Sequence, residues 1–361
     1  MFDINSLPKT FLGANSAGGF CSYFGNSYNP DDGWRAYIIK GGPGTGKSSL
    51  MKQTAAIFAD RGESVEICPC SSDPDSLDAV ILPDRKVAIM DGTAPHVVEP
   101  QFPGVCEKII NLGECWDGKQ FLGCEREVIG LTRQNKQLHA RASRYITAAG
   151  CLMREQAEYA AERCDVSRLT NYAERLAART IKRGDGAAES MRFLGGITPK
   201  GVIFWKTTVN KLCDTVICVC DAAGAVSDLF MHTVRNEALA RGQKIITCFN
   251  PLCPEQIDHI LIPSLRLGFC TEGAFSHPDG VTRRIHAHRF YTGDAVSQKR
   301  ALAAFNRRAA DELLREAVKL IAEAKSCHDL LESYYIAAMD FEAVGRICES
   351  TVNEILSNTQ P

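Results

Sequence analysis

The segment Gly41-Gly42-Pro43-Gly44-Thr45-Gly46-Lys47-Ser48 constrains the fold of this chain more than any other feature, because it matches the pattern G-x-x-x-x-G-K-[ST] throughout. In this pattern the glycines let successive backbone N–H groups point into one concavity, the lysine reaches the β- and γ-phosphates, and the hydroxyl group ligates Mg²⁺. The sequence therefore predicts a phosphate-binding loop. We expect the nucleotide to be held by Gly42, Pro43, Gly44, Thr45, Gly46, Lys47, Ser48 and Ser49.

The residues on either side of this loop agree with the prediction. The apolar run Ala36 to Ile39 precedes it and is typical of a buried strand. Ser49 to Arg61 follows it and has the apolar spacing of an amphipathic helix. A helix that begins at the loop would direct its N-terminal dipole at bound phosphates. The order strand, loop, helix is thus the one that such a site requires.

The overall composition is that of a globular protein. A length of 361 residues allows two or three domains, and a hydrophobic content of 45% is enough for buried cores. The net charge of −2 gives no general attraction to nucleic acid or to anionic membranes. We find no N-terminal signal and no apolar stretch long enough to span a bilayer. These features lead us to expect a cytoplasmic protein.

The sixteen cysteines are expected to be reduced thiols, as in the cytosol. Cys68 and Cys70 are separated by one residue on an expected strand, and so are Cys218 and Cys220. Zinc ligands usually come as C-x₂₋₄-C pairs in loops, so this spacing does not favour a zinc site. We interpret these cysteines as small buried hydrophobic residues.

The chain shows an internal similarity at an offset of about 180 residues. Phe11-Leu12-Gly13 aligns with Phe193-Leu194-Gly195, and Leu77 to Pro83 aligns with Ile257 to Pro263. In the second pair the aspartate and the proline are identical, and four apolar positions stay apolar. Two similar folds in tandem are the simplest explanation.

The same alignment places Cys220 to Ser227 opposite the phosphate-binding loop. Ala225 and Val226 then stand where the first half has Gly46 and Lys47. Loss of the lysine removes the cation over the phosphates, and a side chain in place of glycine crowds the backbone. We therefore expect the second half to bind nucleotide poorly or not at all.

A candidate magnesium ligand follows in the first half. Val87 to Asp91 is an apolar strand that ends in a carboxylate, which is the Walker B arrangement. We expect Ser48 and Asp91 to hold Mg²⁺. The aligned stretch of the second half, Leu267 to Thr271, lacks the acid. Loss of the lysine and the acid together indicates one competent site per chain.

Two further loops are expected at the carboxyl ends of the strands, where open α/β sheets bind their ligands. They are Ser71 to Asp78 and Gly92 to His96. Asp73 aligns with Cys253, so this carboxylate is specific to the first half. It is our first candidate for positioning the attacking water or acting as a general base.

Other polar residues of these loops can be aligned with the second half, and for each a turn residue bonded to its own backbone is the alternative to catalysis. The pairs are Asp75 with Glu255, Asp78 with Asp258, His96 with His277, and Thr93 with Gly273. Asp75 and Asp78 could also cap the following helix.

The remaining sequence has the periodicity of long helices at Glu125 to Ile181 and Ser297 to Leu356. We expect an α/β protein with two tandem P-loop NTPase-type parallel-sheet cores, each with a helical hairpin. The halves would be residues 1–185, catalytic, and 186–361, degenerate. Whether each hairpin packs on its own core or on the other one is left open.

Four motifs can be compared with known proteins: Gly41 to Ser48, Cys70 to Asp78, Asp91 to Val98, and Asn250 to Asp258. Together they resemble an uncharacterised bacterial family of tandem P-loop proteins, over essentially the whole chain. The resemblance implies an ATPase with two P-loop-type halves and no better-defined substrate. The chain departs from that pattern at Cys220 to Ser227, which argues against two competent sites.

These patterns predict a Mg²⁺-dependent ATPase. ATP is the default nucleotide because no Asn-Lys-x-Asp guanine signature occurs. Lys47 would stabilise charge on the phosphates, Asp91 would act through the metal ion, and Asp73 would orient water.

Two alternatives use the same loop. A small-molecule kinase would need an acceptor pocket, which Asp73, Asp78 and His96 could line. A nucleotide-gated binding module would bind ATP tightly and signal through its helices. The sequence leaves open the acceptor, any protein partner, and whether the chain forms a homodimer.

Overall fold

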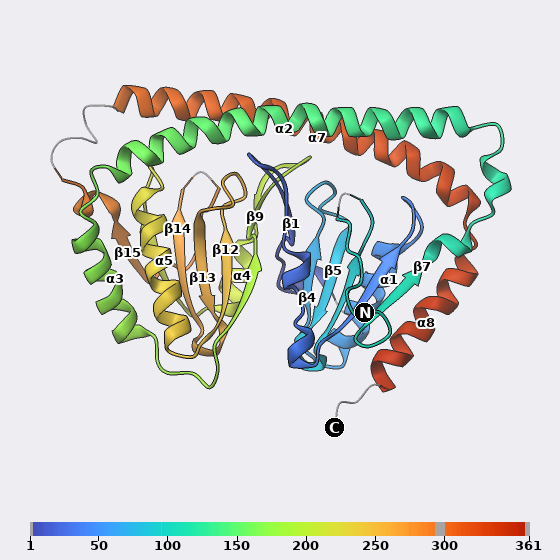
Figure 1. Cartoon of the computed structure of the whole chain (residues 1–361), viewed down its shortest axis with the longest axis horizontal. Coiled ribbons are helices and arrows are strands. Elements are labelled where there is room, and N and C mark those ends of the chain that lie inside the picture. The colour runs from blue at the N-terminus through green and yellow to red at the C-terminus, as the bar shows by residue number, and fades with distance from the viewer. Residues whose placement is uncertain (1–2, 95, 274, 293–299, 358–361) are drawn as a thin grey trace. The chain divides into compact units, whose positions relative to one another are not determined.

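The computed structural model describes residues 3–94, 96–273, 275–292 and 300–357, so Pro95 and the expected helix start at Ser297 lie outside it. The chain is an α/β protein whose two large sheets mix parallel and antiparallel strands (Figure 1). It divides into two compact units. Unit 1 comprises residues 1–13, 22–141 and 319–361, and unit 2 comprises residues 14–21 and 142–318.

Unit 1 contains a five-stranded sheet in the order β4-β5-β6-β3-β7. Its strands are β3 (Arg35–Lys40), β4 (Glu66–Pro69), β5 (Leu77–Leu82), β6 (Val87–Asp91) and β7 (Glu107–Asn111). Strand β3 lies between β6 and β7 and is parallel to both. The strand expected before the glycine-rich loop is therefore an internal strand of the sheet.

The expectation of an all-parallel sheet is wrong, because β5 runs antiparallel to both β4 and β6. Only Pro83 to Lys86 connect β5 to β6. A parallel crossover needs a dozen residues or more, and a connection this short therefore forms a hairpin. Lys86 adopts φ +52° to close this turn.

Side chains of β3 alternate between the two faces of the sheet. Tyr37 and Ile39 pack with residues of α1 (Lys47–Asp60) and α8 (Phe341–Ser357). Ala36 and Ile38 pack on the opposite face, in a second buried cluster. Burial on both faces explains why β3 is a continuous apolar run rather than an alternating one.

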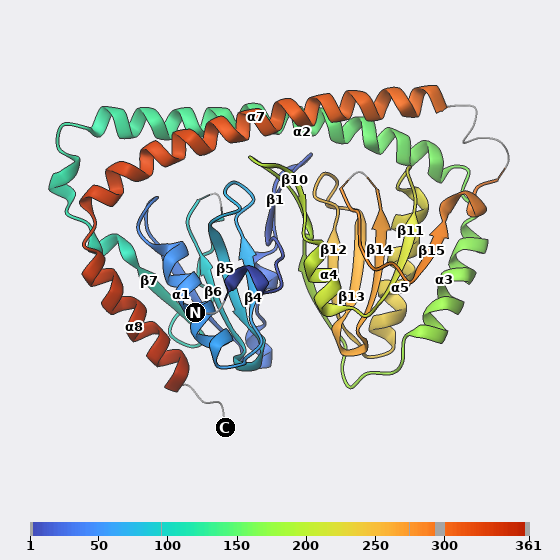
Figure 2. The same cartoon turned by 180° about the vertical axis from the view of Figure 1, so that it is seen from behind.

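Unit 2 contains a six-stranded sheet in the order β15-β11-β14-β13-β12-β8. Its strands are β8 (Ala188–Arg192), β11 (Thr215–Cys220), β12 (Lys244–Phe249), β13 (Ile257–Ile262), β14 (Leu267–Glu272) and β15 (Arg283–His286). Helix α5 (Ala225–Ala240) packs on one face of the sheet and α4 (Lys206–Leu212) on the other (Figure 2).

The two sheets share the same core order and the same strand directions. Strand β11 is parallel to β14 and β15, as β3 is parallel to β6 and β7. Strand β13 is antiparallel to both neighbours, as β5 is. The turn after β13 is closed by Arg266 at φ +47°, in the position of Lys86. A small hairpin comes before β3 and another before β11: β1 (Gly13–Ser16) with β2 (Gly19–Ser22), and β9 (Gly195–Thr198) with β10 (Gly201–Phe204).

The long helices depart from the expected division after residue 185. Helices α2 (Glu125–Ala161) and α7 (Arg300–Ala338) each contribute to both units, which divide after Arg141 and after Val318. Helix α3 (Val166–Thr180) then packs on the core of unit 2, whereas α8 packs on the core of unit 1. Each sheet is thus covered by a helix from the other half of the sequence, which no local pattern indicates.

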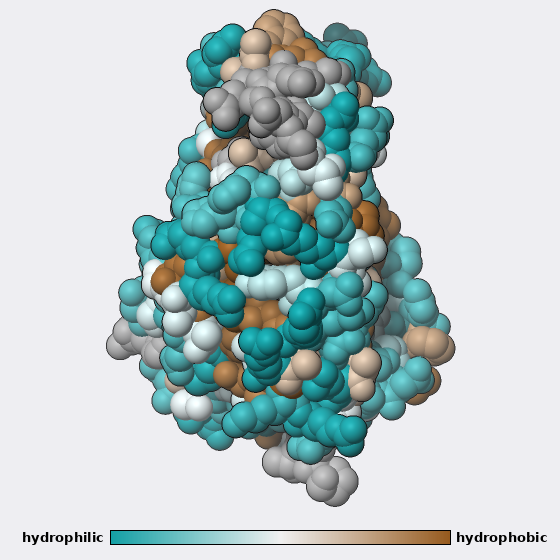
Figure 3. All heavy atoms as spheres, turned by 90° about the vertical axis from the view of Figure 1, so that its left-hand side faces the viewer, coloured by the Kyte–Doolittle hydropathy of each residue, from teal (hydrophilic) through white to brown (hydrophobic). Residues whose placement is uncertain are grey.

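The face of unit 2 that carries α3 is mostly hydrophilic, with smaller apolar areas between the polar side chains (Figure 3). The exposed residues of α3 include Arg168, Asn171, Glu174, Arg175 and Arg179. Among the described helices, none combines the length and the apolar character needed to span a membrane.

Candidate functional site

The Gly41–Ser48 loop connects the carboxyl end of β3 to the start of α1. Gly44 and Gly46 adopt φ +66° and +90°, a region that residues with a side chain rarely occupy. Gly46 also precedes the first residue of α1. The glycines at these two positions are therefore required by the path of the backbone.

Lys47 and Asp91, both singled out from the sequence, lie together. The Lys47 ammonium donates to the carbonyl oxygens of Gly41 (3.1 Å) and Gly42 (2.7 Å), and it lies 3.6 Å from Asp91 Oδ2. The two side chains are only 12% and 14% exposed. Asp91 Oδ1 accepts a hydrogen bond from the backbone N–H of Thr93 (2.8 Å). Thr93 thus takes the role of a turn residue.

The other members of the loop have local roles. Thr45 Oγ1 donates to the carbonyl oxygen of Gly42 (2.9 Å), and Ser48 Oγ accepts from the backbone N–H of Leu77 (3.0 Å). Pro43 is partly exposed, and Ser49 is exposed on α1. Ser48 lies one residue after Lys47, at the N-terminus of the helix.

Asp73 is placed in its own turn. Its carboxylate accepts hydrogen bonds from the backbone N–H of Asp75 (3.3 Å) and from Ser76 Oγ (2.8 Å). It also lies 3.5 Å from the Lys325 ammonium. These contacts are those of a turn-forming aspartate paired with a cation, rather than contacts with Lys47 or Asp91.

Asp73, Asp78 and His96 were expected to line a pocket for a phosphate acceptor. In the structure Asp78 and His96 contact each other, whereas Asp73 is paired with Lys325. Asp78 Oδ1 lies 3.3 Å from His96 Nε2 in a buried ion pair, and the neighbour of this pair is Cys70. Coulombic interaction with Asp78 raises the pKa of His96 against the lowering effect of burial. The charges of Asp91 and Lys47 also act on this imidazole.

The C-terminal part of α7 covers the glycine-rich loop, within unit 1. Glu332 Oε1 accepts a hydrogen bond from the backbone N–H of Gly44 (3.2 Å). The ring of Tyr335 lies against Gly42, where an added Cβ would be 2.7 Å from Cε1 of the tyrosine. His328 lies 3.4 Å from Glu332, and its hydrogen bond lowers the pKa of that carboxyl. A carboxylate thus already binds an N–H group of the loop.

Three aromatic rings gather beside Gly42. The Tyr335 ring centroid is 5.0 Å from that of Phe121 and 5.6 Å from that of Trp116. Sequence reasoning missed Glu332 and this aromatic group, because they come from segments far from the loop along the chain. The periodicity of α7 showed only that the segment is helical.

The corresponding loop of unit 2 must be realigned by one residue. Asp228 Oδ1 accepts a hydrogen bond from the backbone N–H of Ile257 (3.0 Å), as Ser48 Oγ accepts from that of Leu77. Ser48 therefore corresponds to Asp228. It follows that Lys47 corresponds to Ser227, and not to Val226 as the sequence alignment had it.

With this correction, Asp221 corresponds to Gly41. Its carboxylate accepts hydrogen bonds from the backbone N–H groups of Ala223 (3.1 Å), Val226 (2.8 Å) and Ser227 (2.9 Å). The residue is 6% exposed, and Tyr291 donates a further hydrogen bond to it (3.3 Å). The amides at the start of α5 are thus bound by an anion of the chain itself. The sequence signal was an acidic residue a few positions before a helix, as in an N-cap.

No protein-family model and no curated protein matches the sequence, and no solved structure matches the fold. The functional argument therefore depends on the geometry and chemistry of the residues themselves. Two facts carry it. In unit 1, a glycine-rich loop with a lysine that is 12% exposed and a neighbouring carboxylate lies at the end of an internal strand. In unit 2, the amides at the same place donate hydrogen bonds to Asp221.

Proposed function

We propose that the protein binds ATP and Mg²⁺ at the Gly41–Ser48 loop of unit 1 and hydrolyses the nucleotide. The observation that carries the proposal is the contact of Lys47 with Asp91 at the start of α1, 3.6 Å apart. A lysine that reaches phosphates and a carboxylate that acts on Mg²⁺ are the two charged groups that such a site needs. Asp73, the first candidate for positioning the attacking water, has no comparable support because it is paired with Lys325.

The residues have complementary roles in this proposal. The loop amides and Lys47 would stabilise negative charge on the phosphates. Ser48 and Asp91 would hold Mg²⁺, which supplies further charge neutralisation on the phosphate oxygens. Lys47 now donates to two loop carbonyl oxygens, so phosphate oxygens would replace these acceptors.

The aromatic group beside the loop is suited to the base. Purine rings stack favourably on aromatic side chains, and Trp116, Phe121 and Tyr335 present such rings next to Gly42. We propose that the adenine lies against this group.

The tandem arrangement belongs to the same proposal. Five strands of each sheet have the same order, with a loop and a helix after the corresponding strand. This supports two P-loop-type cores, as in the bacterial family that the sequence resembles, with nucleotide binding confined to unit 1.

A nucleotide-gated binding module is the second candidate, and one contact favours it. Glu332 of α7 accepts from the backbone N–H of Gly44. Phosphate oxygens would compete for this donor, so bound nucleotide and the present position of α7 are linked. In this version ATP binding would move α7, and turnover would stay near background until a partner is present.

The decisive experiment compares Lys47→Ala with Ser227→Ala, which changes the corresponding residue of unit 2. We expect Lys47→Ala to lower Mg-ATP hydrolysis by about 100-fold or more, because it removes a charge on the phosphates. Ser227→Ala should leave it unchanged. Undiminished phosphate release by Lys47→Ala would contradict the proposal. Release that appears only with an added metabolite would instead identify a kinase.

Binding can be followed separately from turnover. Of the three tryptophans, Trp116 belongs to the aromatic group, whereas Trp34 and Trp205 do not. ATP should therefore change the emission of the wild-type protein and not that of Trp116→Phe. Tight binding with background turnover would select the gated module over the hydrolase.

A further inference from the structure

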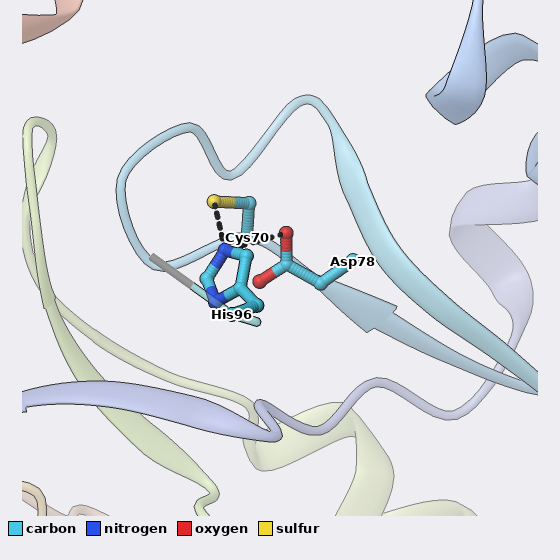
Figure 4. A group of neighbouring side chains, drawn as sticks. All are labelled: Cys70, Asp78 and His96. Carbon is cyan, nitrogen blue, oxygen red and sulfur yellow. Dashed lines mark hydrogen bonds and ion pairs between the residues drawn. The ribbon is translucent and has the colours of Figure 1, made fainter. Parts of the chain in front are cut away.

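Three residues with metal-ligating side chains meet beside the proposed nucleotide site. Cys70 directly follows β4, Asp78 is the second residue of β5, and His96 lies in the turn after β6 (Figure 4). Strand β5 is antiparallel to β4 and β6, so its start lies at the same sheet edge as their ends. The hairpin arrangement that departs from a parallel sheet is what brings the three side chains together.

The distances among the three side chains are those of ligands around one ion. His96 Nε2 is 3.3 Å from Asp78 Oδ1 and 3.9 Å from Cys70 Sγ, and all three ligand atoms lie within 4.8 Å of one another. Tetrahedral zinc, with its usual bond lengths, separates nitrogen from oxygen by about 3.3 Å and nitrogen from sulfur by about 3.6 Å. The sulfur would need to move by only a few tenths of an ångström.

The same geometry argues against a catalytic triad. In a triad, the nucleophile and the acid contact opposite nitrogens of the imidazole. Here the sulfur and the carboxylate both approach Nε2 (Figure 4). Convergence on one nitrogen is instead what three ligands of a common ion produce.

Asp78 supplies an independent observation. Its side chain is 4% exposed, and its Oδ2 atom has no hydrogen-bond partner among the described residues. A buried carboxylate oxygen without a partner is strongly unfavourable, and such atoms in native proteins often mark an ion or a water. A bound cation would compensate it.

Unit 2 shows what the same backbone does with other residues. Cys70 N donates to the Ser76 carbonyl oxygen (3.0 Å), and Asn250 N donates to that of Gln256 (2.9 Å), so Cys70 corresponds to Asn250. Asn250 Nδ2 donates to Asp258 Oδ1 (3.2 Å), which gives the aspartate of unit 2 a partner from its own chain.

The third position also differs between the units. His96 N donates to the Thr93 carbonyl oxygen and Ser276 N to that of Gly273, so His96 corresponds to Ser276 rather than to His277. Unit 1 thus has a cysteine, an aspartate and a histidine where unit 2 has an amide, an aspartate and a hydroxyl group. At these three positions, the combination of thiol, carboxylate and imidazole is thus found in unit 1 and not in unit 2.

We propose that Cys70, Asp78 and His96 bind a Zn²⁺ ion. Thiolate, imidazole and carboxylate are all zinc ligands, whereas Mg²⁺ prefers an all-oxygen octahedral shell. Three protein ligands leave the fourth tetrahedral position to water or to a substrate atom. Cys70 is partly exposed, which gives the ion a route of entry. None of the three residues belongs to the Gly41–Ser48 loop, so this site does not depend on nucleotide binding.

The first test is spectroscopic. The protein is freed of metal with a chelator and titrated with Co²⁺, whose thiolate complexes absorb in the near ultraviolet, and Zn²⁺ is then added in competition. We expect one Co²⁺ per chain, displaced by Zn²⁺. Cys70→Ser should abolish the thiolate band. Loss of a residue that only supports a metal ligand weakens metal binding by about 10- to 100-fold. Because His96 and Asp78 would be ligands themselves, His96→Gln and Asp78→Asn should weaken binding by more than this.

Cys220→Ser is the matched control, because Cys220 lies in another group of possible ligands, with Cys218 and Glu272. In that group Arg284 already lies 3.4 Å from the carboxylate of Glu272. The control should retain the band. Absence of a band in the wild-type protein, or a band that survives Cys70→Ser and is lost in Cys220→Ser, would overturn the proposal.

The second test uses the wild-type protein and needs no variant to fold. Alkylation of each thiol is followed by mass spectrometry with and without Zn²⁺ or Mg²⁺. Zn²⁺ should slow alkylation of Cys70 at least tenfold, and Mg²⁺ should not. The exposed Cys151 serves as the internal control and should react equally in all conditions. Equal reactivity of Cys70 with and without Zn²⁺ would refute the site.

Discussion

The backbone N–H groups at the start of α1 in unit 1 and at the start of α5 in unit 2 differ in their acceptors. Both helices follow the corresponding strand and present backbone N–H groups. In unit 2 the carboxylate of Asp221 accepts from these groups, whereas in unit 1 the corresponding residue is Gly41. Since helix N-termini attract anions, the comparison teaches that a carboxylate of the chain can bind the amides to which we assign phosphate in unit 1.

The comparison extends to the group next to the loop. In unit 2 the side chain of Asn250 donates to Asp258, and the pair needs no further ligand. In unit 1 Cys70 and His96 approach Asp78, one of whose carboxylate oxygens has no partner among the described residues. At both places the groups of unit 2 thus bind one another, whereas unit 1 has the groups to which we assign a nucleotide and a metal ion.

The largest expected effect comes from giving unit 1 the acid of unit 2. Gly41→Asp should weaken ATP binding at least about 1000-fold, or about 4 kcal/mol, because a carboxylate would occupy the amides and repel the phosphates. Gly41→Ala is the control for size alone, since a Cβ there would lie 2.7 Å from Thr45 Oγ1. Calorimetric titration with ATP measures both. Equal affinities of the two variants would show that the carboxylate has no specific role.

The next effect is a pH dependence of the stability of unit 2. Burial raises the pKa of Asp258 to about 7 from its ordinary 3.8. Between these values the folded chain holds a proton that the unfolded chain releases, so the free energy of unfolding falls as the pH rises. Asp258→Asn has no such proton to release, so its free energy of unfolding should not fall in this way. The difference in free energy of unfolding between the variant and the wild type should therefore shift in favour of the variant by about 2 to 4 kcal/mol from pH 4 to pH 7.5.

The measurement is hydrogen exchange in β13, which reports on unit 2 separately. The difference between the two proteins is the quantity to follow, because His259 has the opposite slope. Burial lowers the pKa of His259 to about 3, so its contribution to stability increases with pH up to its ordinary value of 6.5. A relative stability that does not change with pH would mean that Asp258 is ionised in the folded protein.

Part of this comparison could be predicted from the sequence, because it depends on local patterns. The apolar run before Gly41, the glycines, Lys47 and the acid at the end of β6 each have a recognisable type and spacing. Adjacent parallel strands then bring Lys47 and Asp91 together. The offset of about 180 residues also found the corresponding strands of unit 2.

The rest depends on contacts over long distances in sequence or on single-residue alignment. The contact of Glu332 with Gly44 arises because the C-terminal part of α7 covers the loop while α8 packs on the first sheet, and helical periodicity does not say what a helix covers. The sequence alignment paired Lys47 with a residue of unit 2 that was one position too early. For this reason it did not identify Asp221 as the residue that corresponds to Gly41. Cys70 was interpreted as a buried hydrophobic residue because its spacing from Cys68 is not typical of zinc ligands. Its neighbours Asp78 and His96 come from β5 and from the turn after β6, which the spacing of the cysteines does not indicate.

A smaller effect is expected from removing the internal anion of unit 2. Asp221→Ala leaves the buried N–H groups of Val226 and Ser227 without their acceptor and should lower the free energy of unfolding by about 2 kcal/mol. Asp221→Asn keeps one acceptor oxygen and should lose less. Urea denaturation combined with hydrogen exchange in α5 compares the two. If neither variant is destabilised, the carboxylate does not substitute for a ligand.

The smallest effect concerns unit 1, where Glu332 is the only carboxylate among the described residues with a hydrogen bond to an amide of the Gly41–Ser48 loop. Glu332→Gln removes a negative charge that competes with phosphate, so ATP should bind about 3- to 10-fold more tightly, or roughly 1 kcal/mol. Glu323→Gln, on the same helix, is the control and should have no effect. If Glu332→Gln binds ATP no better than this control, α7 does not compete with nucleotide, and the nucleotide-gated version of the function loses its support. An increase confined to Glu332→Gln would show that unit 1, like unit 2, stabilises its loop with an anion of the chain, but with one that a nucleotide can displace.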